Sequence, residues 1–166
     1  MKNKRLITLL SIVAITAAVL WAQRRPGLPP SVDRRGVPNW ELDNEMPRDV
    51  FTFVRIRYSS SYGRRGGGWR TDYPDADLNF SYRLQELTSL KVHPEGIILE
   101  LTDPKLFDYP FIYIIEPGAL QFSNEEVVAL RKYLLNGGFL MVDDFWGGYE
   151  YENFAREMKR VFPDRA

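Results

Sequence analysis

The stretch from Tyr109 to Asp144 constrains the fold most strongly, because it reads as strand, helix, strand. Residues 111–115 and 139–142 are unbroken apolar runs of strand length. Such runs are typical of strands that are covered on both faces, as in a parallel sheet flanked by helices. The stretch therefore predicts a βαβ unit at the centre of the chain.

The helix between the two runs carries its own start and stop signals. Ser123 and Glu126 have the spacing of a capping box, in which each side chain bonds a free backbone amide of the first turn. Gly137 and Gly138 supply the left-handed end of the helix. Three apolar residues follow the cap at helical spacing: Val127, Leu130 and Leu134.

The folded domain is predicted to occupy residues 49–166. Its first strand is Phe51–Tyr58, whose alternation separates two faces. One face carries Phe53, Arg55 and Arg57, and the other carries Val54, Ile56 and Tyr58. A long loop, 59–74, then leads into the next element.

Three more elements complete the domain. Asp75 is expected to cap a helix that runs to Ser89, and Gly96–Leu101 is expected to form a short strand. A final helix is expected from Glu150 onward. The expected inner face of the first helix is Ala76, Phe80, Leu84 and Leu87.

This order of elements predicts an α/β fold, a three-layer α/β/α sandwich with a mostly parallel sheet. Right-handed crossovers and covered faces leave few other arrangements. By analogy with flavodoxin-like sheets, the expected strand order is 2-1-3-4.

Residues 1–22 have the pattern of a hydrophobic N-terminal helix for export or anchoring. Lys2, Lys4 and Arg5 precede an uncharged run from Leu6 to Ala22. A cleaved signal peptide and a retained membrane anchor both fit this pattern. Either one places the protein in the cell envelope, in the periplasm or on the inner membrane. Residues 23–48, rich in proline and arginine, are expected to be a linker.

Composition excludes several kinds of chemistry. The 22 basic and 22 acidic residues give a net charge of +0, which argues against a general nucleic-acid binder. The chain has no Cys and one His, His93, so a thiol nucleophile and a Cys- or His-rich zinc site are excluded. No metal site is predicted, and no cofactor is indicated.

The ligand crevice of an open parallel sheet lies at the carboxyl ends of its strands, where the strand order reverses. Here that position falls between the first and third strands. We expect the loops that end there to bring together five residues as a ligand-binding site: Arg70, Asp72, Glu116, Asp143 and Trp146.

Three kinds of side chain at this edge suggest a polar ligand. Converging carboxylates can bind a cation or act as acid and base, but they also cap helices. The segment Arg64–Arg70, with three consecutive glycines, suits an anion but lacks a nucleotide-loop fingerprint. Tyrosine and tryptophan rings suit a carbohydrate, although they also serve to cover a sheet edge.

The chain also resembles a bacterial family of domains of unknown function, the DUF4159 family. The matching segments are residues 69–80, 101–104, 116–118, 134–140, 142–147 and 161–164. The resemblance implies a class I glutamine-amidotransferase-like fold, shared with trehalose-utilisation-type proteins, and an envelope association. The amidotransferase nucleophile, a Cys, has no counterpart here. Family domains continue past the stretch 162–165 into a His-containing segment and a further strand, so the resemblance leaves open a C-terminally truncated member.

Three functions remain open from the sequence. The first is a binding domain for a small polar or carbohydrate-like ligand or a protein partner. The second is a hydrolase of sugar or amide type that uses Asp143 and Glu116. The third is a membrane-anchored assembly module that recruits envelope proteins through its sheet edge.

Overall fold

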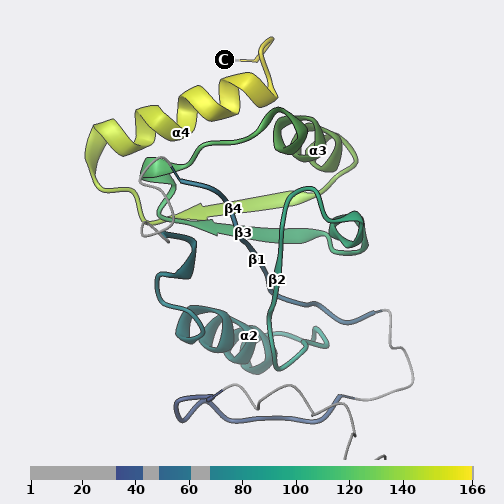
Figure 1. Ribbon diagram of the computed structural model, residues 1–166. Helices are drawn as coiled ribbons and strands as arrows, with labels where there is room; N and C mark the ends of the chain where they lie inside the picture. Colours follow the sequence, from purple (N-terminus) through teal and green to yellow (C-terminus); the bar gives the residue numbers. More distant parts are fainter. Residues whose placement is uncertain (1–32, 43–48, 61–67, 166) are drawn as a thin grey trace, which may run out of the picture. The chain divides into compact units, whose positions relative to one another are not determined.

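The computed structural model describes residues 33–42, 49–60 and 68–165 (Figure 1). The predicted export segment 1–22 and most of the predicted linker 23–48 lie outside these residues. In the part of the chain that is described, no helix is both long and apolar enough to cross a membrane.

Four parallel strands form the sheet in the order β2-β1-β3-β4. They are β1 (Val54–Ile56), β2 (Ile97–Leu99), β3 (Phe111–Ile115) and β4 (Phe139–Asp143). The order confirms the predicted 2-1-3-4 arrangement, so the strand order reverses between β1 and β3.

Helices cover both faces of this sheet. In Figure 1, α2 (Asp75–Leu87) lies below the sheet, whereas α3 (Asn124–Leu135) and α4 (Gly147–Val161) lie above it. The predicted α/β/α layering is confirmed.

The central βαβ unit matches its sequence signals closely. Ser123 Oγ accepts the amide of Glu126 at 3.2 Å, and the Glu126 carboxylate accepts the amide of Ser123 at 2.7 Å. Gly137 ends the helix with a φ of +92°. All five residues of β3 are buried. The strong local signals therefore predict α3 and the buried strand β3 correctly.

Each face of the sheet has its own core. The face toward α3 and α4 buries Val54, Ile56, Ile112 and Ile114 among other aliphatic residues. The face toward α2 is largely aromatic, with Phe53 in ring contact with Phe80, Phe111 and Tyr113. The alternation of β1 predicted this division.

β4 differs from its prediction as a strand buried on both faces. It is the last strand of the sheet, and Phe139 at its start is 60% exposed. Its other four residues are half-buried or exposed. An apolar run alone does not distinguish a central strand from an edge strand.

α2 agrees with its prediction only in part, since Phe80 packs on the aromatic core as expected. Its buried residues are Asp77, Leu78 and Ser81, and Leu87 is 78% exposed. Pro74 occupies the N-cap position without a side-chain cap. The helix is turned so that Asp77 meets Arg55 of β1 beneath the sheet.

The segment that precedes the domain contacts it through the side chains of Arg34, Arg35 and Trp40, and Arg35 Nη1 pairs with Asp75 Oδ2 at 3.1 Å. Trp40 Nε1 donates to the Val92 carbonyl at 2.7 Å, and Arg34 Nη1 donates to the Pro94 carbonyl at 2.8 Å. Residues 34–42 therefore contact the domain between α2 and β2.

Candidate functional site

Three loops meet at the carboxyl ends of the strands. One contains the short helix η2 (Gly68–Arg70), which follows β1 in the chain, and one contains η4 (Pro117–Ala119), which follows β3. The third runs from β4 into α4. In Figure 1 they gather on the left, where the arrows of β3 and β4 point.

Gly68 allows η2 to approach η4 closely. A Cβ on residue 68 would lie 2.6 Å from Tyr58 Oη and 3.2 Å from Glu116 Cβ. These distances leave no room for a side chain, so the glycine permits the backbone contact.

Tyr58 sits at the base of this meeting point. Its buried phenol donates to the carbonyls of Ile115 and Glu116, at 2.8 and 2.6 Å. Burial raises the pKa of the Tyr58 phenol, and the negative charges of Glu116 and Glu150 raise it further. Tyr58 is therefore a protonated donor that joins the ends of β1 and β3.

Glu150 is a member of this site that the sequence reasoning missed. Its carboxylate accepts the Trp146 amide at 2.8 Å and lies over Gly118, where a Cβ would come within 2.3 Å of Glu150 Cδ. A glutamate in the first turn of a predicted helix is a signal for such a cap. Its contact with η4 arises from tertiary packing.

A buried ion pair fixes the loop after β1. Arg55 Nε donates to both carboxylate oxygens of Asp77, at 2.9 and 3.2 Å, and Nη2 also pairs with this carboxylate. Arg55 Nη1 donates to the carbonyls of Trp69 and Thr71. Burial raises the pKa of Asp77, while Arg55 opposes the rise. Arg55 thus ties the strand, the helix and the loop together.

Asp143 lies at the end of β4, on the face toward α2. Its carboxylate accepts the Tyr113 hydroxyl at 3.3 Å and the Asp144 amide at 2.9 Å. Burial raises the pKa of the Tyr113 phenol, and the Asp143 charge raises it further. Asp143 as a whole residue is exposed to solvent.

The five predicted site residues all lie at this edge but form separate groups. Glu116 lies beside Tyr58 and Gly68, whereas Asp143 contacts Tyr113 on the other face. Arg70 is exposed, with its guanidinium carbon 5.4 Å from the centre of the Trp69 ring. Asp72 is exposed at the start of the loop into α2. The fifth, Trp146, is 71% exposed at the start of α4.

Each of the three loops contains one acidic residue whose backbone has a left-handed conformation. They are Asp72, Glu116 and Asp144, with φ of 54°, 47° and 65°. Non-glycine residues adopt this region infrequently, and glutamate less readily than aspartate. Over residues 33–42, 49–60 and 68–165, no group of three or more His, Cys, Asp or Glu side chains is arranged to hold a metal ion.

These features define a parallel α/β domain whose carboxyl edge is acidic and rimmed by exposed aromatic rings. The sequence profile of a domain of unknown function, DUF4159, matches residues 52–166. The chain belongs to this family. No curated protein matches it.

Proposed function

We propose that the domain binds a small polar ligand of carbohydrate type, with hydroxyl or amino groups, at the carboxyl edge of its sheet. The observation that carries the proposal is the set of left-handed acidic residues, one in each loop: Asp72, Glu116 and Asp144. Such backbone costs free energy and clusters at ligand sites, where the surrounding structure maintains it.

Exposed aromatic rings at the same edge support a carbohydrate ligand. Trp146 and Tyr149 begin α4, and their side chains are 71% and 73% exposed. A flat ring beside carboxylates offers an apolar surface for a sugar face and acceptors for its hydroxyl groups.

The residues whose carboxylates a hydrolase would use, Glu116 and Asp143, have different partners. Glu116 lies near Tyr58, which belongs to the core beneath α3 and α4. Asp143 bonds Tyr113, which belongs to the core above α2. A hydrolase that used both carboxylates would need them to flank one scissile bond.

Two further features of the protein belong to the same proposal. The apolar run 6–22 supports location in the cell envelope, as a periplasmic or membrane-anchored domain. The strand order supports kinship with the glutamine-amidotransferase-like folds, without their nucleophile.

Isothermal titration of the full chain with glucosamine and glucose tests this function. The acidic edge should favour the amino sugar over its neutral counterpart. Glu116→Gln should weaken glucosamine binding by about tenfold, as expected for loss of a charge-assisted hydrogen bond. Glu86→Gln, at an exposed position on α2, is the matched control and should bind like the wild type. Absence of heat with either sugar at millimolar concentration would refute the proposal.

A further inference from the structure

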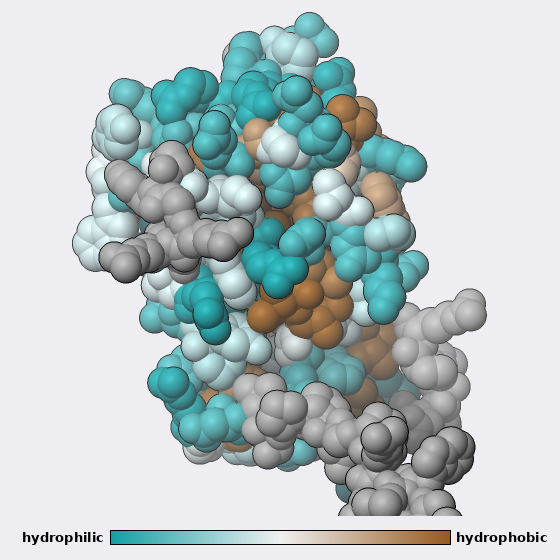
Figure 2. Space-filling view, in the orientation of Figure 1, coloured by the Kyte–Doolittle hydropathy of each residue, from teal (hydrophilic) through white to brown (hydrophobic). Residues whose placement is uncertain are grey.

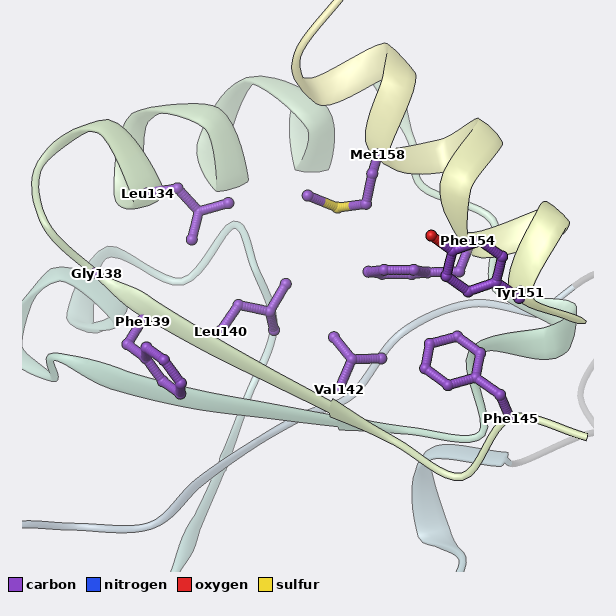
Figure 3. A pocket seen from close by; sticks show the side chains of 9 residues that line it. All are labelled: Leu134, Gly138, Phe139, Leu140, Val142, Phe145, Tyr151, Phe154 and Met158. Atoms are coloured by element: carbon purple, nitrogen blue, oxygen red, sulfur yellow. The ribbon is translucent and has the colours of Figure 1, made fainter. Parts of the chain in front are cut away.

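Two apolar surfaces of the domain are open among the described residues. Figure 3 shows a groove of about 510 Å³ in which Leu140 and Val142 of β4 face Phe154 and Met158 of α4. Figure 2 shows an apolar patch at the level of the sheet. A third surface, between α2 and β2, is different, because the structure shows the segment that covers it, residues 34–42.

This segment precedes the residues that match the family, yet it has a defined shape. A tight turn follows Arg34, closed by a 2.8 Å hydrogen bond from the Val37 amide to the Arg34 carbonyl. The Arg34 guanidinium donates to the carbonyls of Val37 and Pro38, at 3.2 and 2.7 Å. Its central carbon lies 5.7 Å from the centre of the Trp40 ring. Arg34 therefore organises the segment as well as bonding the domain.

The contacts that the segment makes with the domain lie near the surface. Besides its hydrogen bonds to two backbone carbonyls of the domain, the Trp40 ring lies near Tyr82, with ring centres 6.1 Å apart. The side chains of the Arg35–Asp75 ion pair are 58% and 41% exposed, and such a pair contributes little. Every residue of 34–42 is half-buried or exposed, whereas all of β1 is buried. A segment held in this way opens locally at a lower free energy than the core of the domain.

We propose that residues 34–42 form a latch, a segment that closes on the domain and opens without unfolding it. The latch sets the length of chain between the apolar run 6–22 and the domain. When it is closed, residues 23–33 link the two and can span at most about 40 Å. When it is open, residues 23–48 link them and can span at most about 90 Å.

The consequence for function rests on the envelope location proposed above. With the run 6–22 retained as a membrane anchor, opening the latch roughly doubles the distance that the carboxyl edge of the sheet can reach from the membrane. The closed latch therefore restricts the domain to ligands near the membrane.

Distances between two spin labels, measured by pulsed electron paramagnetic resonance, test the latch in the full chain. The chain has no Cys, so labels attach only at Glu41→Cys and Glu86→Cys, both at exposed positions. The closed latch should give mainly one narrow distance distribution. Trp40→Ala removes the hydrogen bond to Val92 and the ring near Tyr82. The ratio of open to closed latch should then rise about tenfold, seen as a longer and broader distribution.

A second pair of labels, at Gln23→Cys and Glu86→Cys, tests the effect on chain length. The mean distance between these labels should increase in Trp40→Ala, because more residues then separate the N-terminal run from the domain. An unchanged mean distance would refute this effect.

Trp146→Ala, a matched change outside the latch, is the control and should leave both distributions unchanged. Arg34→Gln removes the bond to Pro94 and should also open the latch. A narrow distribution retained in both Trp40→Ala and Arg34→Gln would overturn the proposal. Loss of the circular dichroism of the domain in both variants would overturn it as well, because the segment would then belong to the core.

The spin-label distances involve neither a sugar nor a membrane. Failure of the latch is therefore distinguishable from failure of the proposed function, which appears in the glucosamine titration. It is also distinguishable from failure of the proposed location, which appears in cell fractionation.

Discussion

Arg55 and Asp77 form an ion pair in which the two side chains are 0% and 2% exposed. The rings of Tyr73 and Tyr113 lie near the guanidinium, with centres 5.8 and 5.2 Å from its central carbon. Because β1 supplies the arginine and α2 the aspartate, this pair fixes how the helix packs on the sheet.

The first prediction concerns this pair. Asp77→Asn should lower the free energy of unfolding by about 3–5 kcal/mol, because it leaves the Arg55 charge buried and unpaired. Urea unfolding followed by circular dichroism measures the change. The exposed pair Arg57–Glu100 is the internal control, and Glu100→Gln should cost less than about 1 kcal/mol. Equal costs for the two substitutions would contradict a buried role for Asp77.

The second prediction concerns the turn after α3. Gly137 has a φ of +92°, and no atom lies within 4 Å of the position that a Cβ would occupy, so a side chain there meets strain and no clash. Gly137→Val should lower the free energy of unfolding by about 1–3 kcal/mol, and Gly137→Asn by less. Thermal melting of both variants checks the difference. Identical melting temperatures for the wild type and Gly137→Val would place the helix stop elsewhere.

Gly138, the next residue, is constrained for a different reason. A Cβ there would lie 2.3 Å from the ring of Tyr133. Gly138→Ala should therefore be destabilising through overlap with this ring, and a second substitution, Tyr133→Leu, should partly relieve it. If the double variant is no more stable than expected from the two single changes, the overlap is not the cause.

The third prediction separates a ligand site from a structural network. Asp143 is exposed, so Asp143→Asn should change the free energy of unfolding by less than about 1 kcal/mol or raise it. Differential scanning calorimetry measures the effect, with Asp77→Asn as the buried comparison. A loss as large as that of Asp77→Asn would make Asp143 part of the structural framework.

The fourth prediction concerns alkaline pH. Burial raises the pKa of Tyr133 from 10.0 to about 12. Above about pH 10 the unfolded chain releases this proton while the folded chain retains it, so the free energy of unfolding falls as pH rises from about 10 to 12. The decrease should be on the order of 1 kcal/mol per pH unit.

Urea unfolding at about pH 9 and about pH 11 tests this, together with absorbance of ionised tyrosine. Tyr58 and Tyr113, whose pKa values are also raised, should add to the decrease. Tyr133→Phe should make the pH dependence shallower. An unchanged dependence in this variant would exclude Tyr133 as a contributor.

The fifth prediction concerns the N-terminal segment. Deleting residues 1–22 removes the basic start and the uncharged run. The shortened protein should move from the membrane or periplasmic fraction to the cytoplasm. Cell fractionation with immunodetection measures the distribution. A full-length chain found only in the cytosol would contradict the export signal.

The sequence predicts most where the signal is local. The capping box at Ser123 and the stop at Gly137 act within one helix, so their effect does not depend on distant residues. The predicted inner face of α2 was right for Phe80, which packs on the aromatic core, and wrong for Leu87, which is exposed. It also missed Asp77, which is buried by Arg55, a residue 22 positions earlier. Likewise, the exposure of Phe139 follows from the position of β4 in the sheet, which an apolar run does not encode.

At the candidate site, too, the sequence predicts some features and misses those that depend on distant residues. Parallel strands place their carboxyl ends together, so the sequence predicts which loops meet there. It does not predict that Glu150 lies over Gly118, because that contact depends on the path of α4. Nor does it predict that Glu116 and Asp143 face different tyrosines.

The hydrogen bonds that Arg55 donates to two backbone carbonyls restrict the local opening of the loop after β1. The Trp69 and Thr71 carbonyls are held by the same guanidinium that pairs with Asp77. The loop cannot detach without disturbing that pair, so its local opening should be coupled to loss of the β1–α2 contact. Amide hydrogens at 71 and 73, although they lie in a surface loop, should exchange with deuterium nearly as slowly as those of β1.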